Sequence, residues 1–212
     1  MRTMMPVLLF AVVVIILLQL LLRRKNAPRR SFQKLQDELA EENRLYTRQR
    51  PVEESMLFVP DISLLPVQAY NADEMAEKKA AIHQQQVLAQ CETTMLHFDA
   101  PFTNKELKER FGTAQLEKIA LYEENYVKLM HQMVVWAESL RRDGRDTEAV
   151  QVLEAGIAYG SDHSKMFTVL ADLYNTRREK DALLRLLPAA ERLAEPIRGK
   201  VKKQIEQYLS EM

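Results

Sequence analysis

The C-terminal half of the chain repeats itself at a fixed interval. A shift of 34 positions, which we call one repeat length, pairs large apolar residues with large apolar residues and small ones with small ones at six places. The pairs are Met133 with Phe167, Trp136 with Leu170, Ala137 with Ala171, Leu140 with Tyr174, Leu153 with Leu187, and Gly156 with Ala190. The apolar residues recur every three to four positions, as they do along one face of an amphipathic helix. A repeat of this length accommodates two antiparallel helices. The sequence therefore predicts a stack of helical hairpins and an all-α body.

These pairs resemble the pattern of the tetratricopeptide repeat (TPR) family. The first unit carries it at Trp136-Ala137, Leu140, Gly144, Ala149, Leu153 and Gly156, and the second at Phe167, Leu170-Ala171, Tyr174, Leu187 and Ala190. Small residues let helices approach closely, and large ones fill the spaces between them. The pattern departs at Arg178, where a turn glycine would stand, and at Leu183, which replaces a small residue. The resemblance implies two TPR-like repeats over residues 130–195 and a capping helix in residues 196–212.

The resemblance also implies a surface that binds a partner. In TPR proteins the first helix of each repeat, helix A, lines the concave face. The corresponding residues here, which we call the helix-A groove, are His131, Val134, Glu138, Arg141, Lys165, Thr168, Asp172 and Asn175. Their mixed polar chemistry suits an extended peptide or a partner helix. Some TPR domains clamp a chaperone's C-terminal carboxylate with Lys and Asn at fixed groove positions. Here one such position holds Val134 and Thr168 in the two repeats, and another holds Glu138 and Asp172, so we do not predict chaperone-tail binding.

The N-terminal apolar run predicts a single transmembrane helix over residues 4–22. Gln19 is its only strongly polar residue, and nineteen helical residues span close to the roughly 30 Å hydrocarbon core of a bilayer. The basic residues Arg23-Arg24-Lys25 follow at once, without a small-residue cleavage site, which favours an uncleaved anchor over a signal peptide. The excess of basic residues on this side predicts a cytoplasmic body. We expect a bacterial inner membrane, although topology alone also permits a periplasmic or organellar orientation.

Two segments separate the anchor from the body. Residues 23–50 form a basic juxtamembrane segment and an amphipathic helix, whose apolar stripe consists of Phe32, Leu35, Leu39 and Tyr46. Because its polar face is acidic, anionic lipid would repel it, and we expect it to pack on the body or on a second copy. Residues 51–70 form a linker with three prolines and many apolar side chains. A solvated linker would be rich in Gly, Ser or charge, so we expect this one to pack along the body, with the groove as one potential location.

Residues 71–129 are predicted to be helical and are a candidate for a divergent repeat. The capping box at Thr103 and Glu106 predicts a short helix that ends near Gly112. Apolar periodicity predicts a helix over residues 71–97 before it and a long one over residues 114–142 after it. The pattern then predicts helices over four further ranges, namely 147–159, 165–176, 180–194 and 197–209.

Composition and motifs argue against several kinds of chemistry. Only five glycines occur, none clustered, which excludes a Gly-rich phosphate-binding loop. The basic and acidic side chains balance at 30 each, so total charge gives no reason to expect a nucleic-acid partner. The four histidines, which are His83, His97, His131 and His163, lack the spacing of a metal site on one helix face. Nothing in the sequence places a base beside Cys91. We therefore predict no enzyme, no metal, no cofactor and no small-molecule substrate.

The charge is distributed unevenly. The first 36 residues hold seven basic and no acidic side chains, which leaves residues 37–212 with a net charge of minus seven. A basic front on an acidic body suits a chain held at a negatively charged surface. We therefore predict a single-pass adaptor or scaffold that binds a protein or peptide partner. The alternatives are an obligate structural subunit of a membrane complex, and a regulator or sensor with its chemistry in residues 72–129.

Overall fold

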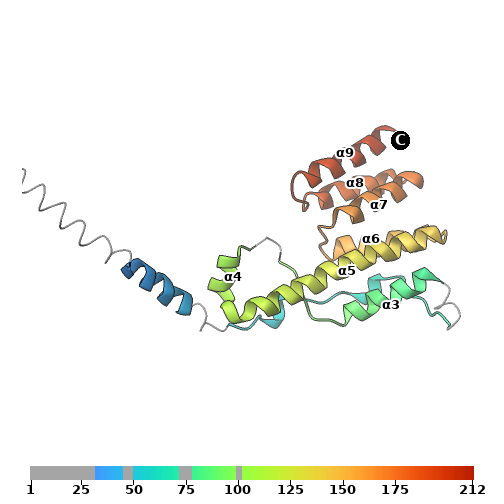
Figure 1. Ribbon diagram of the computed structural model, residues 1–212. Helices are drawn as coiled ribbons and strands as arrows, with labels where there is room; N and C mark the ends of the chain where they lie inside the picture. The colour runs from blue at the N-terminus through green and yellow to red at the C-terminus, as the bar shows by residue number, and fades with distance from the viewer. Residues whose placement is uncertain (1–31, 45–49, 72–77, 99–101) are drawn as a thin grey trace, which may run out of the picture. The chain divides into compact units, whose positions relative to one another are not determined.

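A computed structural model describes residues 32–44, 50–71, 78–98 and 102–212, and these residues are mostly helical (Figure 1). This confirms the all-α class in its coarse form. Their contacts divide the chain into two units. Unit 1 draws on Met1–Pro51 and Phe102–Leu116, and unit 2 on Val52–Pro101 and Glu117–Met212.

Unit 1 contains a helix over residues 32–44, the helix α4 (Asn104–Phe111) and the 3-10 turn η3 (Thr113–Gln115). The predicted capping box is confirmed: the Thr103 amide donates to a Glu106 carboxylate oxygen at 2.7 Å, and the Glu106 amide donates to the Thr103 hydroxyl at 3.3 Å. Residues 32–44 are exposed throughout, including the apolar side chains of Phe32, Leu35 and Leu39, so the surface that this stripe packs against stays a prediction.

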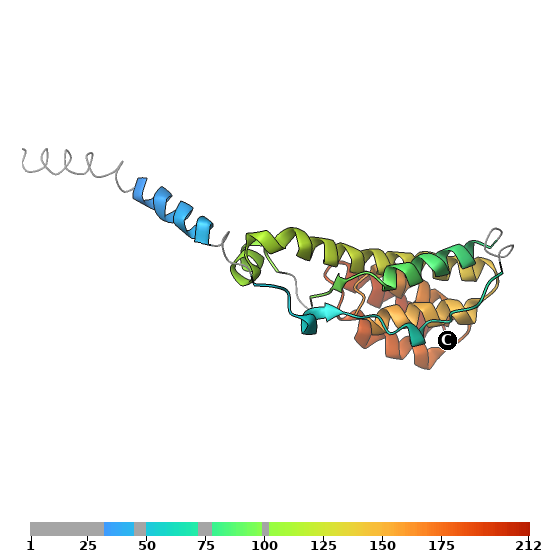
Figure 2. The same ribbon diagram turned by 90° about the horizontal axis from the view of Figure 1, so that it is seen from below.

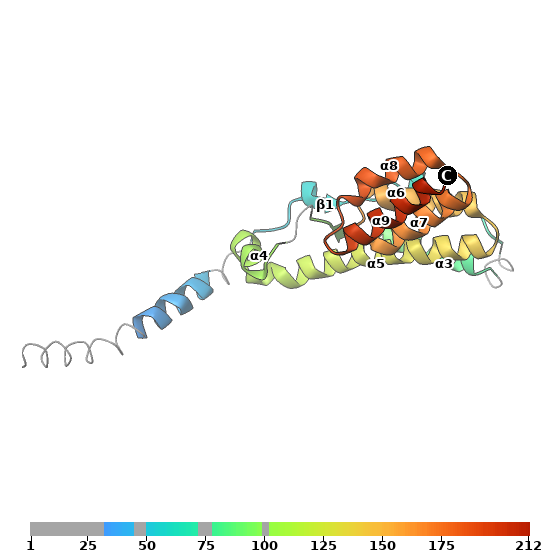
Figure 3. The ribbon, with the colours of Figure 1, turned by 90° about the horizontal axis from the view of Figure 1, so that it is seen from above.

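Unit 2 holds the main core. Its helices are α3 (Lys79–Cys91), α5 (Leu116–Arg142, from its second residue onward), α6 (Asp146–Ala158), α7 (Ser164–Thr176), α8 (Lys180–Ala190) and α9 (Ile197–Ser210). Helices α7, α8 and α9 pack on one another (Figure 3). Large side chains predicted for the repeat core, such as Trp136, Phe167 and Leu170, are fully buried. The methionines Met95 and Met133 are buried too, as core residues rather than surface ones.

The repeat is visible in the helix boundaries. Helices α5, α7 and α9 end at Arg142, Thr176 and Ser210, so that each ends one repeat length after the last. Helices α6 and α8 begin at Asp146 and Lys180, which are again one repeat length apart. Helix α9 therefore ends in register with α5 and α7.

The turns that follow α5 and α7 share one geometry. Gly144 has φ +74° and Arg178 has φ +56°, so both adopt the left-handed conformation. In each turn the backbone amide of the next residue donates a hydrogen bond to a helix carbonyl at 2.9 Å, from Arg145 to Leu140 and from Glu179 to Tyr174. This is the Schellman ending of a helix, which glycine favours because it lacks a Cβ. Arg178 thus occupies a glycine position in a turn that forms nonetheless.

The repeated turn predicts opposite effects for two substitutions. Arg178→Gly should raise the free energy of unfolding by about 0.5–1 kcal/mol, because it relieves a side chain held in the left-handed region. Gly144→Ala should lower it by about 1 kcal/mol. A Cβ at Gly144 would meet nothing within 4 Å, so the effect there is purely conformational. Urea unfolding of both variants measures this, and changes of the same sign would contradict it.

The linker is part of the folded body, as expected. We call residues 57–70 the strap. Its strand β1 (Leu57–Phe58) pairs antiparallel with β2 (Met95–Leu96), with Leu57 opposite Leu96 and Phe58 opposite Met95. The Tyr159 hydroxyl donates to the Asp61 carbonyl at 2.6 Å. The Gln84 side chain exchanges two hydrogen bonds with the backbone of Gln68, at 2.7 and 3.0 Å.

The strap continues alongside α6 (Figure 2), where its residues 63–66 and four α6 residues line a shallow hollow. It then reaches Tyr70, whose hydroxyl accepts a hydrogen bond from Arg145 at 2.7 Å. Because α6 is the second helix of the first sequence repeat, the strap lies beside a helix that contributes no residue to the helix-A groove.

Two sequence predictions need correction here. The helix predicted over residues 71–97 ends at Cys91 among the described residues, and it is followed by β2 rather than by more helix. The Gln90 side chain and carbonyl both bind the Thr93 hydroxyl, at 2.9 and 2.7 Å, which fixes a turn at this point. The helix predicted over residues 180–194 ends at Ala190.

None of the helices in the described part of the chain combines the length and the apolar character that a bilayer crossing requires. The anchor predicted over residues 4–22 lies outside the described residues.

Candidate functional site

The helix-A groove residues lie on two helices of unit 2. Helix α5 carries His131, Val134, Glu138 and Arg141, and helix α7 carries Lys165, Thr168, Asp172 and Asn175. Within each set the spacing is three or four residues, which places the side chains along one side of the helix. The structure then shows which members of the two sets meet.

Glu138 and Lys165 join the two helices. The Lys165 ammonium lies 2.7 Å from a Glu138 carboxylate oxygen, and both side chains are partly exposed. An exposed ion pair of this kind contributes about 0–1 kcal/mol to stability. It therefore orients two opposite charges at the surface without making them unavailable to a partner.

Two histidines approach each other near this ion pair. The rings of His131 and His163 have centroids 6.0 Å apart. His163 immediately precedes α7, and its Nδ1 atom is buried without a hydrogen-bond partner. Burial, and secondarily the neighbouring His131, lowers the pKa of His163. Its ring is therefore neutral at pH 7 and keeps an unused polar atom beside the groove.

Two of the predicted groove residues are not available to a partner, because one is buried and the other is hydrogen-bonded to α9. Val134 is only 1% exposed and belongs to the core. Asp172 accepts hydrogen bonds from the Tyr208 hydroxyl at 2.7 Å and from the Gln204 side chain at 2.8 Å, both on α9. Helix α9 thus takes up the predicted groove position at Asp172.

The remaining groove residues are accessible to different degrees. His131 and Lys165 are exposed, and four are partly exposed, namely Glu138, Arg141, Thr168 and Asn175. The Thr168 hydroxyl donates to the Lys165 carbonyl at 3.1 Å, which leaves its oxygen as an acceptor. The accessible surface is therefore polar, carries both signs of charge, and centres on the Glu138–Lys165 ion pair.

No family model, no curated protein and no solved structure matches the chain. The repeated residues and the repeated helix ends and turns described above therefore stand without a matching family.

Cys91 is the one cysteine of the sequence, and its environment disfavours a reactive thiolate. Burial, assisted by the charge of Glu92, raises the pKa of its thiol to about 11. The thiol is therefore protonated at neutral pH and is a weak nucleophile. Among the residues that the structure describes, no three His, Cys, Asp or Glu side chains are grouped as metal ligands would be.

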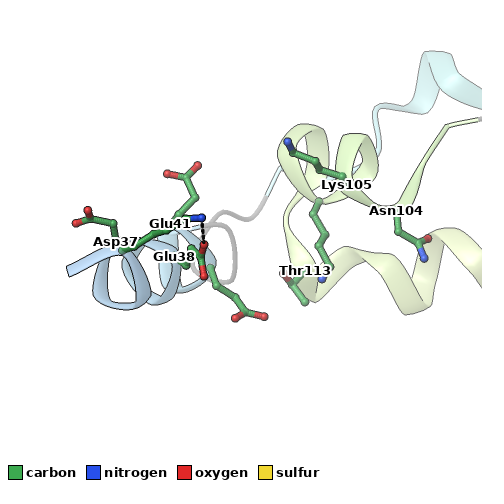
Figure 4. A pocket seen from close by; sticks show the side chains of 9 residues that line it. Asp37, Glu38, Glu41, Asn104, Lys105 and Thr113 are labelled. Carbon is green, nitrogen blue, oxygen red and sulfur yellow. Dashed lines mark ion pairs between the residues drawn. The ribbon is translucent and has the colours of Figure 1, made fainter. Parts of the chain in front are cut away.

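Unit 1 contains a hollow of its own, of about 550 Å³ (Figure 4). Acidic side chains of the helix over residues 32–44 line one side, among them Asp37, Glu38 and Glu41, and Lys105 and Lys108 lie on the side of α4. Among the described residues of this unit, three ion pairs are formed along the helices themselves, Lys34 with Glu38 at 3.9 Å, Arg44 with Glu41 at 2.8 Å and Lys105 with Glu109 at 3.8 Å. We assign no function to this open gap between exposed helices.

Proposed function

We propose that this protein is a membrane-anchored, TPR-like adaptor or scaffold that holds a protein partner through the helix-A groove and performs no catalysis. The observation that carries the proposal is the Glu138–Lys165 ion pair between α5 and α7. The two residues come from helices whose ends and following turns recur with the repeat. This groove suits an extended peptide or a helix with charges of both signs.

The anchor proposed for residues 4–22 gives this surface its mechanism. Confinement to a membrane raises the effective concentration of any partner in the same membrane, so that weak contacts are sufficient for capture. A partly exposed ion pair and a few polar side chains provide contacts of that strength. The adaptor would therefore bind reversibly, with its specificity set by the order of charges along the groove.

Reversal of the groove charges should abolish partner binding. The full-length chain is tagged, extracted from membranes in mild detergent after brief cross-linking, and compared with the Arg141→Glu/Lys165→Glu variant. We expect specific partners to fall at least tenfold in the variant, measured by quantitative mass spectrometry. The control variant, Arg185→Glu/Lys200→Glu, makes the same charge change at exposed residues of α8 and α9 and should retain them.

A charge swap separates recognition from folding. Lys165→Glu alone places two carboxylates together, whereas Glu138→Lys/Lys165→Glu restores an ion pair with its ends exchanged. The swapped variant should have the thermal stability of the parent chain but should not bind the partner. Recovery of the partner by the swap would mean that the pair is only structural, and would contradict the proposed groove.

A second candidate function is that of an obligate subunit in a membrane complex. It is supported by apolar side chains exposed in both units, namely Phe32, Leu35 and Leu39 in unit 1 and Leu121 and Val127 on α5. An obligate subunit should self-associate or aggregate when it is purified alone, whereas an adaptor should remain monomeric. Light scattering of the full chain in detergent distinguishes them.

A further inference from the structure

Unit 2 contains a second concave site, separate from the helix-A groove. It is a hollow of about 950 Å³, formed where β1, the residues after β2, helix α5, the end of α6 and the α8–α9 turn come together. We call it the aromatic hollow, because its lining includes five aromatic or imidazole rings: Phe58, His97, Phe98, Tyr126 and Tyr159. None of its lining residues belongs to the helix-A groove, so the inference below does not rest on the proposed function.

The rings of the hollow hold one another in place. The His97 ring stacks on Tyr126 with centroids 4.3 Å apart, and Phe58 meets Tyr126 and Tyr159 edge to face at 5.1 and 5.6 Å. The Tyr126 hydroxyl donates to the Tyr159 carbonyl at 3.1 Å, and the Tyr159 hydroxyl donates to the strap at Asp61. Both phenolic protons are therefore engaged within the protein. What the hollow offers a ligand is a preformed aromatic wall.

Two carboxylates lie in the same lining. Glu123 on α5 and Asp162 after α6 have no hydrogen-bond or ion-pair partner for their carboxylates among the described residues. Burial raises the pKa of Glu123, as expected for an acid that lacks a partner. The guanidinium of Arg192, which also lines the hollow, donates to the Ile157 carbonyl at 2.9 Å. The lining thus carries two negative charges and one positive charge, a formal excess of one negative charge.

This combination selects the chemistry of the ligand. An anion would be repelled by Glu123 and Asp162, and a neutral apolar group would cover the half-buried Glu123 without compensating its charge. A cation with an apolar stem satisfies both parts, because aromatic rings attract cations and also pack against methylene groups. We propose that the aromatic hollow binds the side chain of a lysine on a partner polypeptide, with its ammonium group between Glu123 and Asp162 and its methylenes against the rings.

Binding is tested with a minimal probe on the full-length chain in an uncharged detergent. The probe is Nα-acetyl-lysine N-methylamide, and its Nε-acetylated form is the neutral counterpart with nearly the same shape. Affinities are measured by NMR titration. We expect the charged probe to bind at least fivefold more tightly than the neutral one. Equal affinities would overturn the proposal, and so would tighter binding of n-butylamine, which carries the same single charge and methylene stem without a peptide backbone, because the ligand would then not be a polypeptide side chain.

Isosteric variants connect the binding to the two carboxylates. Glu123→Gln/Asp162→Asn keeps the size of both side chains and should weaken the charged probe about tenfold while leaving the neutral one unchanged. The matched control, Glu124→Gln/Asp143→Asn, removes two exposed charges outside the hollow and should leave both affinities unchanged. Equal weakening by the two double variants would mean that only the overall charge matters, which would also overturn the proposal. The NMR spectrum of each variant reports whether the fold is retained.

Discussion

Phe58→Ala should lower the free energy of unfolding by about 2–3 kcal/mol, although Phe58 lies in a proline-containing segment between the N-terminal region and the helices of the body. Its ring packs on Tyr126 and Tyr159, and its backbone pairs with Met95 through β1 and β2. Truncation of a fully buried phenylalanine costs about 3–5 kcal/mol, and Phe58 is half-buried, so a smaller loss is expected. The loss corresponds to a fall in melting temperature of roughly 5–10 °C.

The neighbouring residue is the control for this prediction. Val59 follows Phe58 in the chain but is 82% exposed, so Val59→Ala should change the free energy of unfolding by less than about 0.5 kcal/mol. Thermal and urea unfolding of both variants give the comparison. Equal and small effects would show that the strap is a passive spacer, contrary to its hydrogen bonds and ring contacts.

Gly156→Ala should lower the free energy of unfolding by about 1–2 kcal/mol, because α6 and α7 touch at this residue. A Cβ at Gly156 would collide with the sulfur and terminal methyl of Met166, which is fully buried on α7. Alanine is otherwise the better helix former by about 1 kcal/mol, so the collision has to outweigh that gain. Overpacking of a core in this way costs about 1–3 kcal/mol before any compensation.

A double-mutant cycle isolates the collision. Met166→Val removes the two atoms that a Cβ at Gly156 would strike. In that background Gly156→Ala should cost less than about 0.5 kcal/mol, which gives a coupling energy of at least about 1 kcal/mol. Additive effects of the two substitutions would contradict the close approach of α6 and α7 at this point.

The helices of the repeated region could be predicted from sequence because their determinants are local. The expected range 147–159 lies one residue later than α6 at both ends. The expected range 165–176 begins one residue later than α7 and ends at the same residue. Apolar periodicity and turn residues suffice for such helices. The strands β1 and β2 are very short and depend on the pairing of Leu57 with Leu96, which lie far apart in the chain, and no local pattern contains that pairing.

The composition of the groove could be predicted only in part. Sequence spacing placed its eight residues on two helices, but the Glu138–Lys165 contact and the burial of Val134 depend on how those helices pack. The loss of Asp172 to Tyr208 and Gln204 depends on the position of α9. The sequence predicted a capping helix in residues 196–212, but it did not predict which groove residue the helix would contact. His163 was missed because it precedes its helix.

The strap also constrains how the protein is made. Its hydrogen bond from Tyr159 to Asp61 spans 98 residues of sequence, and that from Arg145 to Tyr70 spans 75. At a synthesis rate of about 5–20 residues per second, the strap leaves the ribosome roughly 5–20 seconds before α6 exists to receive it. Its apolar side chains are exposed to water or to a chaperone during that interval. The helical hairpins have mostly local contacts and can form as they emerge, so closure of the strap is expected to be the last folding event of unit 2.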